Sequence, residues 1–335
     1  MSAIFIHGLG AVSPAGWGVA ALRETMAIHQ PLPVQFINRP GWDTQLAIRA
    51  VPPPLPRPPF LGHPRLRRAA TISQHAIAAA LEAVGSDAAL VQSGALRLGV
   101  IATTMAGSVT YSRRFYEEVL LNPAIASPLL FPETVFNAPA SHLAAYLNSP
   151  GINYTLVGDD GTFLQGLALA AEWLAEDRVD ACVVLGMEEL DWIVGDAGRI
   201  FQRTSIHAGG AGALYLKKQS SARTVLAAIT DTFPFTKLQS RAEATRRMRG
   251  QLGPGTPTEL LCDSANKTTW PDWPGQRLSP KGILGEAFNA SAAWQCVIAC
   301  DQIVTGQVPA ATVSIVGANQ QAIGARFTQT TISPI

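Results

Sequence analysis

Two acidic residues stand at the sharpest turn that the sequence predicts. The stretch Gly151–Glu188 is typical of a strand, a turn, a helix and a strand, and the turn itself is Gly158-Asp159-Asp160-Gly161. An aspartate beside a helix start can accept backbone N–H bonds and suits the helix dipole. A carboxylate could also serve as a general acid or base. We expect Asp160 to cap the helix and Asp159 to be a turn residue.

Thiols and imidazoles offer little further chemistry in this pattern. No short-spaced cysteine pair suggests zinc, and the four cysteines are expected to be buried free thiols. They are Cys182, Cys262, Cys296 and Cys300. The six histidines all fall in the first 207 residues, and they are His7, His29, His63, His75, His142 and His207. We expect His207, which precedes a glycine-rich strand, to lie at the surface, and we expect no metal site.

Charge and hydropathy narrow the class of protein. The 335-residue chain has a formal net charge of +1, which does not suggest a nucleic-acid partner. Charged residues make up 15% and apolar residues 47%, a balance that favours a large core and a surface partly covered by a partner. No apolar run approaches the roughly 18 residues of a membrane span. The N-terminal stretch lacks a basic region before its apolar run, so we expect no signal peptide and a cytoplasmic location.

Strands and helices are predicted to alternate along the whole chain, which indicates the α/β class. Predicted strands are 3–9, 96–103, 153–157, 180–186, 212–217, 224–230, 259–263, 312–316 and 322–328. Predicted helices are 15–26, 65–84, 109–120, 139–147, the segment after Gly161, 240–249 and 283–304. The proline-rich run Val51–Phe60 is predicted to be a surface connection, because proline lacks the backbone N–H.

Five blocks, in the same order, resemble the β-ketoacyl synthase family. Together they span nearly the whole chain, and their ordered co-occurrence carries the resemblance. They are Ile6–Pro14, Leu98–Ala102, Phe131–Asn137 with Ser149–Asp160, Gly209–Leu214, and Lys281–Gly285 with Ala290-Ser291-Ala292. The resemblance implies the thiolase fold, an α-β-α-β-α sandwich of two similar βαβα halves. We place these halves at residues 1–218 and 219–335, joined in one globular unit.

The catalytic positions of the family are altered in this sequence. The family uses a cysteine and two histidines, and the resemblance places Asp160 at the cysteine, Ser264 at the first histidine and Glu286 at the second. Lys281 matches the family's site lysine. Ile315 falls in the segment that carries the family's phenylalanine gate. A carboxylate that attacked a thioester would give a mixed anhydride, which is too reactive to store an acyl chain.

The carboxylates leave structural and catalytic interpretations open. Glu286 could pair with Lys281 or with a backbone donor, and Lys281 could be either a remnant of the family's site or a structural cation. Asp160, Asp263 and Glu286 could instead form a paired-carboxylate hydrolytic site. A cation site on these carboxylates is disfavoured, because Lys281 would oppose it.

The resemblance implies a non-catalytic subunit similar to the chain length factors of type II polyketide and aryl polyene systems. Such a subunit pairs with an active β-ketoacyl synthase in a heterodimer, and acyl carrier protein reaches it through the complex, without a cofactor of its own. The expected interface is the surface around 129–137 and 153–157. The interface and tunnel residues expected there are Leu130, Phe131, Val135, Phe136 and Phe163. The alternatives are a diverged acyltransferase or thioesterase with a non-cysteine site, and a catalytically silent homodimer.

Overall fold

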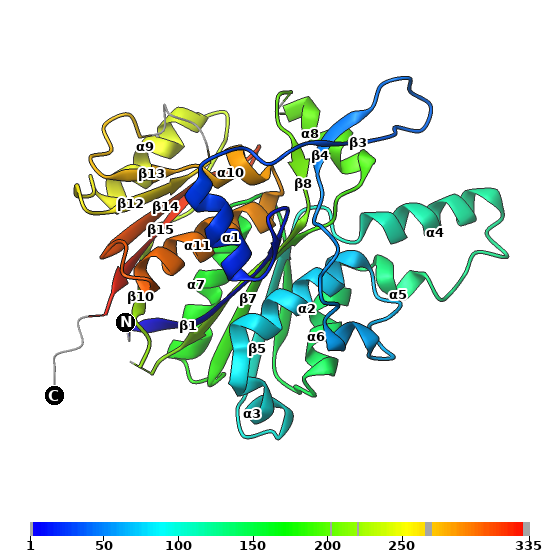
Figure 1. Ribbon diagram of the computed structural model, residues 1–335, viewed down its shortest axis with the longest axis horizontal. Helices are drawn as coiled ribbons and strands as arrows, with labels where there is room; N and C mark the ends of the chain where they lie inside the picture. The colour runs from blue at the N-terminus through cyan, green and yellow to red at the C-terminus, as the bar shows by residue number, and fades with distance from the viewer. Residues whose placement is uncertain (1–2, 202, 220, 265–269, 331–335) are drawn as a thin grey trace.

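The computed structural model describes residues 3–201, 203–219, 221–264 and 270–330, and its strands form two matching sets of five (Figure 1). The first set is β1 (Ile4–Ser13), β5 (Leu98–Thr104), β6 (Asn153–Val157), β7 (Ala181–Glu188) and β9 (Gly210–Lys217). The second set is β10 (Thr224–Ile229), β12 (Leu260–Asp263), β13 (Gln276–Leu278), β14 (Ala310–Val316) and β15 (Gln321–Gln329).

Both sets have the same strand order and the same strand directions. The first runs β1-β9-β7-β5-β6 and the second β10-β15-β14-β12-β13, so each follows the order first, fifth, fourth, second, third. In each set the first two pairs are antiparallel and the last two are parallel. β1 pairs antiparallel with β10 and joins the sets into one sheet path. The predicted repetition of two halves is therefore confirmed, while the boundary at 218/219, in the connection between β9 and β10, stays a prediction.

Helices cover the outer faces of the two strand sets and fill the space between the sets (Figure 1). α2 (Thr71–Val84) covers the outer face of the first set, and α9 (Arg241–Leu252) covers the outer face of the second. α7 (Thr162–Ala175) and α11 (Phe288–Val304) lie between the two sets. α11 is buried on almost every side, as expected for a helix that is apolar or small all round. These layers confirm the predicted α-β-α-β-α sandwich.

Glycines allow the close contact between layers. A Cβ atom on Gly10 of β1 would lie 1.9 Å from the carbonyl oxygen of Ala79 on α2. A Cβ atom on Gly186 of β7 would lie 2.2 Å from the carbonyl oxygen of Asn289 on α11. Neither position can take a larger residue unless the backbone of the neighbouring helix shifts.

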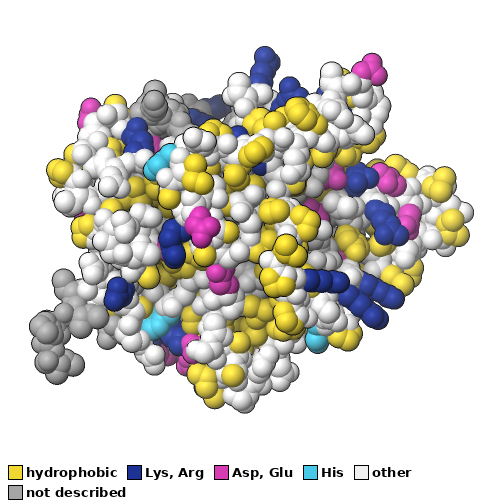
Figure 2. All heavy atoms as spheres, viewed as in Figure 1, with side chains coloured by type: hydrophobic (Ala, Val, Ile, Leu, Met, Phe, Trp, Pro, Cys, Tyr) yellow, Lys and Arg dark blue, Asp and Glu magenta, His cyan; other side chains and the backbone are white. Residues whose placement is uncertain are grey.

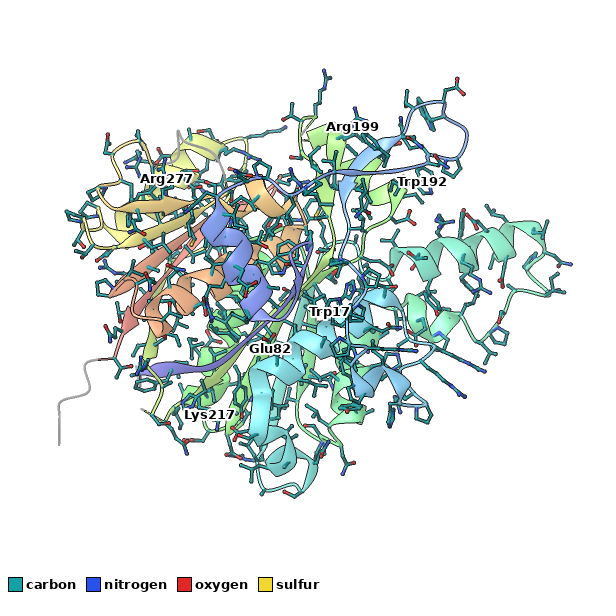
Figure 3. The ribbon with its side chains drawn as sticks, in the orientation of Figure 1. Trp17, Glu82, Trp192, Arg199, Lys217 and Arg277 are labelled. Atoms are coloured by element: carbon teal, nitrogen blue, oxygen red, sulfur yellow. The ribbon has the colours of Figure 1, made fainter. Side chains whose placement is uncertain are left out.

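The start of α1 is fixed by a carboxylate from another layer. α1 (Val19–Ile28) follows the short strand β2 (Gly16–Trp17), and it begins four residues later than predicted. Glu82 on α2 accepts hydrogen bonds from the backbone N–H groups of Val19, at 2.8 Å, and of Ala11, at 2.9 Å. Figure 3 labels Glu82 beside Trp17 at this junction. The tertiary contact, rather than a local cap, therefore sets where α1 begins.

One predicted helix is broken in two. The prediction of a single helix over 283–304 is wrong, because α10 (Pro280–Leu284) ends at Gly285 and α11 begins only at Phe288. Gly285 has φ of 101°, a backbone conformation that favours glycine, so the chain turns sharply there. The turn carries Glu286. The helix predicted over 65–84 is also shorter than expected, since α2 starts at Thr71 rather than at Arg65.

The remaining elements lie around this core. A second, three-stranded sheet consists of β3 (Gln35–Ile37), β4 (Leu46–Arg49) and β8 (His207–Ala208). Short elements are η1 (Pro59–Gly62), η2 (Gly85–Asp87), α3 (Ala88–Gln92), α8 (Trp192–Phe201) and β11 (Phe233–Pro234). The proline-rich run has neither helix nor strand before Pro59, as predicted.

An arm of two helices, α4 (Val109–Leu121) and α5 (Phe131–Thr134), projects from the first half, and α4 extends farthest from the body in Figure 1. α6 (Ala138–Tyr146) follows the arm along the chain and packs against α2. All thirteen residues of α4 are described, and none is buried. A helix with an apolar side and no buried residue in its own chain has an unpartnered surface.

Candidate functional site

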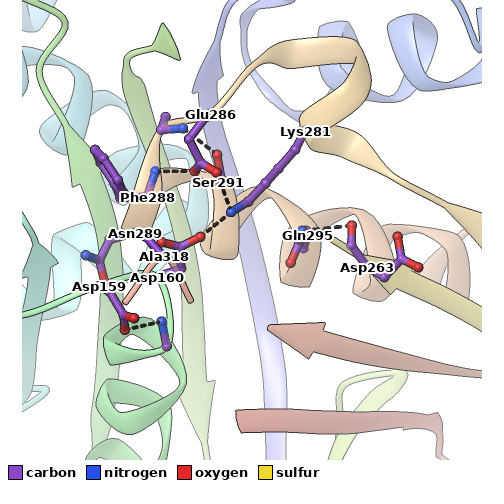
Figure 4. A network of polar contacts seen from close by, with 12 residues as sticks. Asp159, Asp160, Asp263, Lys281, Glu286, Phe288, Asn289, Ser291, Gln295 and Ala318 are labelled. Atoms are coloured by element: carbon purple, nitrogen blue, oxygen red, sulfur yellow. Dashed lines mark hydrogen bonds and ion pairs between the residues drawn. The ribbon is translucent and has the colours of Figure 1, made fainter. Parts of the chain in front are cut away.

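A buried lysine joins two carboxylates at the position where the sequence predicts the altered catalytic residues (Figure 4). Lys281 on α10 donates through Nζ to Oδ2 of Asp160 and to Oε2 of Glu286, the latter at 2.8 Å. The side chains of Lys281, Asp160 and Glu286 are 8%, 1% and 5% exposed. We call these three residues the Lys281 cluster.

Glu286 is held in place by hydrogen bonds of both its side chain and its backbone. Its Oε1 accepts a hydrogen bond from the N–H of Phe288 at 2.9 Å. Its own N–H donates to the carbonyl of Ile206, and its carbonyl accepts from the N–H of Ala208, both at 2.8 Å. The turn between α10 and α11 is therefore tied to β8, and the carboxylate is held pointing at Lys281.

The cluster keeps its lysine charged. Burial alone would lower the pKa of Lys281, but the charges of Asp160 and Glu286 outweigh burial and raise the pKa above its ordinary value. Burial and the charge of Asp160 raise the pKa of Glu286, while Lys281 opposes that shift. A protonated lysine has no free electron pair, so Lys281 cannot act as a nucleophile in this state.

The prediction that Asp160 caps α7 is wrong. Asp160 bonds to Lys281 through Oδ2, and its buried Oδ1 has no hydrogen-bond partner among the described residues. Its neighbour Asp159 takes the backbone donors instead: Gly161 N–H bonds to Oδ1 at 3.3 Å, and Gln320 N–H bonds to Oδ2 at 3.0 Å. Asp159 is fully buried and ties two loops together, which a simple turn residue would not do.

The loop bound by Asp159 follows the segment expected to hold the family's aromatic gate. Ile315 is fully buried within β14, so it presents no side chain to an opening. Gly317, just after β14, packs so closely that a Cβ atom there would lie 2.0 Å from Oδ2 of Asp159. The loop is therefore fastened to the turn that carries Asp160.

A cavity of about 240 Å³ lies beside the Lys281 cluster. It is lined by Arg49, Thr204, Ser205, Ile206, Ser264, Lys281, Gly282 and Glu286. Ser264, predicted at the first histidine position, thus faces the same space as two members of the cluster. Asp263 lies apart from them, beside Gln295 in Figure 4, and is held by Ser279 Oγ at 2.5 Å and by Arg277. Lys281 binds Asp160 and Glu286, whereas Ser279 and Arg277 bind Asp263. The three carboxylates of the predicted hydrolytic site therefore do not share one set of partners.

His207 is buried, and the prediction that it lies at the surface is wrong. It is 3% exposed, and among the described residues neither ring nitrogen has a hydrogen-bond partner. Its ring packs between Gly198 of α8 and the ring of Phe288, whose centroid is 6.0 Å away. Burial lowers the pKa of His207 to about 4, with smaller contributions from Lys281 and Arg199. The imidazole is therefore neutral at pH 7.

The cysteines, which could have served as metal ligands, are buried inside the protein. All four cysteines are free and buried, as predicted, and burial raises the pKa of each thiol. Within the described ranges, no group of three or more His, Cys, Asp or Glu side chains could hold a metal ion. In the same part of the chain, no helix is long and apolar enough to cross a membrane.

The predicted interface residues divide into exposed and buried sets. Phe131, Val135 and Phe136 are 55%, 36% and 43% exposed. Leu130 is buried at 6%, and Phe163 is fully buried in the core that packs around α11. Phe163 lies on the inner face of α7, so it has no exposed surface to offer to a partner.

Two buried groups near the site have no counterpart in the sequence analysis. Arg49 donates to the carbonyl oxygens of Leu32, at 2.8 Å, and Gly282, and burial lowers its pKa. Glu188, at the end of β7, accepts from the backbone of Met105 and Ala106, and burial raises its pKa to about 8. Both lie in segments that look like ordinary strand ends, and only their tertiary surroundings set them apart.

Known structures share this fold over nearly the whole chain. The ishigamide ketosynthase/chain length factor matches with 17% identity and a TM-score of 0.76, over 98% of this chain and 99% of that one. The ketosynthase ApeO in complex with its chain length factor ApeC, from Xenorhabdus doucetiae, matches with 14% identity and a TM-score of 0.75, over 98% of each chain. A β-ketoacyl synthase from Burkholderia phymatum STM815 matches with 14% identity and a TM-score of 0.79, over 98% of this chain and all of that one.

The fold is thus that of the β-ketoacyl synthases, as the sequence predicted. At these identities the likeness extends to the fold alone. No model of a known protein family and no curated protein matches the sequence.

Proposed function

We propose that this chain, which has the ketosynthase fold, is a non-catalytic subunit similar to a chain length factor. It pairs with an active β-ketoacyl-ACP synthase and shapes the acyl tunnel in polyketide or fatty-acid-like biosynthesis, as in aryl polyene systems. The observation that carries the proposal is the Lys281 cluster: at the position that the resemblance assigns to the nucleophile, a buried carboxylate pairs with a lysine.

The chemistry of the cluster argues against condensation by this chain alone. Condensation requires a thiolate that can carry the acyl chain as a thioester, and donors that stabilise an oxyanion. Asp160 and Glu286 bring two carboxylates to that place, and Lys281 is occupied by both of them. The buried neutral His207 packs against Phe288 and does not line the adjoining cavity. The described site therefore supplies neither the thiolate nor the free donors.

An unpartnered apolar surface supports pairing with a second subunit. Ten of the twenty exposed large apolar side chains of the described chain fall between Tyr116 and Val157. They are Tyr116, Leu120, Leu121, Ile125, Leu129, Phe131, Val135, Phe136, Tyr154 and Val157. Figure 2 shows apolar side chains over the projecting α4 arm. Isolated exposed apolar residues are ordinary, but a concentration of this kind is typical of an interface.

The strand at the end of the sheet path adds a second argument. β6 pairs with β5 on one side, and among the described strands nothing pairs with its other side. An open edge with Tyr154 and Val157 about half exposed favours pairing with another chain. A stable interface over this edge and the arm would bury on the order of 2,000 Å² or more.

The partners of similar folds point in the same direction. Two of the similar structures are ketosynthases together with their chain length factors. A third, AntDE:AntF, is described as a type II polyketide acyl-carrier protein in complex with its ketosynthase, and it matches with 14% identity and a TM-score of 0.79. By analogy we propose an active ketosynthase as the direct partner of this chain, and a carrier protein that binds through the complex.

One observation favours the alternative of a diverged acyltransferase or thioesterase. The cavity of about 240 Å³ opens on Glu286, whose pKa is raised, and a raised carboxyl pKa suits a general acid. Lys281 holds that carboxylate in an ion pair, which makes this the weaker of the two proposals.

Co-expression with a candidate active ketosynthase tests the proposal. We expect a stable heterodimer in size-exclusion chromatography, synthesis of a defined product only by the complex, and no turnover of acyl thioesters by the pure chain. Turnover by the pure chain would establish the enzyme alternative. A homodimer that neither binds the ketosynthase nor turns over acyl thioesters would establish the homodimer alternative.

A further inference from the structure

The Lys281 cluster brings together, inside the protein, the groups that an amide bond between two side chains requires. The ammonium group of Lys281 contacts Oδ2 of Asp160, which is bonded directly to the carboxyl carbon Cγ. Glu286 contacts the same ammonium at 2.8 Å and so places a second carboxyl group beside the first (Figure 4). The cluster therefore holds an amine, a carboxyl carbon and a group that can carry protons in contact with one another.

Asp160 is the carboxyl group of the cluster that is free to change its bonding. Its buried Oδ1 has no hydrogen-bond partner among the described residues, whereas buried polar atoms ordinarily have at least one. Both oxygens of Glu286 are occupied, since Oε1 accepts from the N–H of Phe288 and Oε2 accepts from Lys281. Asp160 can therefore react without the loss of a second contact, while Glu286 is held in place beside it.

Charge and burial favour a neutral product. The cluster joins one cation to two carboxylates, and within the described ranges no second cation forms an ion pair with Asp160 or Glu286. Burial of ions costs free energy that an ion pair recovers only in part, whereas an amide is neutral. An amide between Lys281 and Asp160 removes the charges of both, and it leaves Glu286, whose pKa is raised by burial, to take up a proton.

The surroundings suit both the approach of the two groups and the release of water. The backbone of Glu286 is tied to Ile206 and Ala208, which keeps the turn that carries its carboxyl group beside Lys281. Groups held in contact react much faster than free groups, because the entropy of their encounter is already lost. The cavity of about 240 Å³ is lined by Lys281 and Glu286, so it can receive a released water molecule.

Two other contacts between a lysine and an aspartate on this chain lack these features. Lys217 contacts Asp87, and Lys218 contacts Asp177. All four of these side chains are more exposed than those of the Lys281 cluster, and among the described residues no second carboxylate contacts either ammonium. They are internal controls, since contact with an aspartate alone should not produce an amide.

We propose that an amide bond joins the side chains of Lys281 and Asp160 in the mature protein, with Glu286 as the proton carrier for its formation. The bond would link the turn between β6 and α7, in the first half, to α10 in the second half. It would also block permanently the position that the resemblance assigns to the nucleophile. This modification goes beyond the proposed function, because it concerns the chain by itself and needs no partner.

The step is a condensation that needs no further reactant. Lys281 passes one proton to the carboxylate of Asp160, which leaves a neutral amine and a neutral acid. Nζ then forms a bond to Cγ of Asp160. Glu286 accepts a second proton from Nζ and donates it to the departing oxygen, so that the Cγ–O bond breaks and one water molecule leaves. Glu286 ends the step as it began, and the amide nitrogen keeps the third proton.

Mass spectrometry of the pure full-length chain measures the bond directly. The mass of the denatured protein is compared with the mass that its sequence gives, and a tryptic digest is searched for linked peptides. Glu286→Gln keeps the size of the side chain and removes the proton carrier, and Asp160→Ala removes the acceptor. The matched control is Glu243→Gln, which removes a carboxyl group that pairs with an exposed arginine. Melting temperature checks that each variant folds.

We expect the main species of the unaltered protein, and of Glu243→Gln, to be lighter than the sequence mass by one water molecule. Trypsin should not cut after Lys281, so that peptide 278–326 is found joined to peptide 115–178. Glu286→Gln and Asp160→Ala should have the full mass of their sequences, and trypsin should cut them after Lys281.

The full sequence mass in the folded, unaltered protein overturns the inference, whatever the variants show. A loss of water with Lys281 free overturns it as well, because Asp160 precedes Gly161 and could form a cyclic imide with its own backbone. An equal yield of a link between Lys217 and Asp87, or an undiminished link in Glu286→Gln, contradicts the assigned chemistry. Since only the pure chain is measured, failure of the heterodimer to form leaves this result unaffected.

Discussion

The ammonium group of Lys281 bonds directly to the carboxylate of Asp160, which lies 121 residues earlier in the chain. Glu286, in the turn that follows α10, bonds to the same ammonium at 2.8 Å. A buried cation with two buried carboxylates is costly to disturb, because removal of one partner leaves the others uncompensated. The contact compensates the charges that this chain carries at the positions that the resemblance assigns to catalytic residues.

Removal of the lysine should destabilise the protein strongly. Lys281→Met leaves Asp160 and Glu286 facing each other inside the protein, and we expect a loss of about 3–5 kcal/mol in the free energy of unfolding at pH 8. The loss should be smaller at pH 5, because the pKa of Glu286 is raised by burial and by Asp160, which favours the neutral acid there. Urea unfolding at the two pH values measures both effects.

Asp160→Asn is the matched control for that variant. It keeps the pair of Lys281 with Glu286, so we expect a cost of about 1 kcal/mol and normal product synthesis by the complex. If Asp160→Asn stops synthesis while the protein remains folded and paired, Asp160 is catalytic and the pseudoenzyme proposal is wrong.

A cysteine at position 160 should not restore condensation. Asp160→Cys supplies the thiol but no histidine that could activate malonyl groups, since the buried His207 packs against Phe288. We expect no condensation product from the isolated variant, as measured by mass spectrometry with acyl and malonyl carrier protein. Product formation at a rate near that of the active partner would contradict the proposal.

Changes at the exposed phenylalanines should alter product length. Phe131 and Phe136 are about half exposed on the proposed interface, and shortening either to alanine would enlarge a tunnel that they bound. We expect a shifted distribution of chain lengths rather than loss of product. Leu90→Ala, at a similarly exposed position on α3, is the control and should leave the distribution unchanged.

Hydrogen exchange offers a separate check of the same surface. Amides of β6 and of residues 129–137 should exchange more slowly in the heterodimer than in the free chain, because a partner covers the open edge. Equal exchange in both states would remove this region from the interface, whatever the chain-length result.

The contribution of His207 to stability should fall as pH drops from about 6.5 to about 4. Burial lowers the pKa of His207 from 6.5 to about 4, so in this window the unfolded chain binds a proton that the folded chain does not. Stability gained from the neutral imidazole is therefore present above pH 6.5 and lost on acidification. We expect the unaltered protein to lose up to about 1.4 kcal/mol per pH unit relative to His207→Leu.

The difference between the two proteins isolates this group. Glu188 has a pKa raised to about 8 and acts in the opposite direction, since it binds a proton in the folded state between about pH 4.5 and 8. That contribution is common to both proteins and cancels. If the two unfolding profiles run parallel between pH 4 and 6.5, then His207 is not held neutral in the folded state.

The sequence alone determined the class, the layers and the position of most elements. Alternating strand and helix patterns have a local cause in residue size and polarity, so β5, β6 and α4 appear within a few residues of their predicted ends. Prolines excluded regular structure from Val51 to Pro58 for an equally local reason. The resemblance also predicts that Asp160 and Glu286 occupy altered catalytic positions, and this assignment stays a prediction.

Tertiary structure decided what those residues do. Neither Asp160 nor Asp159 has the role expected of it, because Lys281 and the Gln320 loop reach the turn from distant parts of the chain. His207 is buried because β8 packs between α8 and the turn at Phe288, which no local pattern reveals. Partners separated by more than a hundred residues set charge, burial and hydrogen bonding, and these long-range contacts, rather than local preference, fix the chemistry of the site.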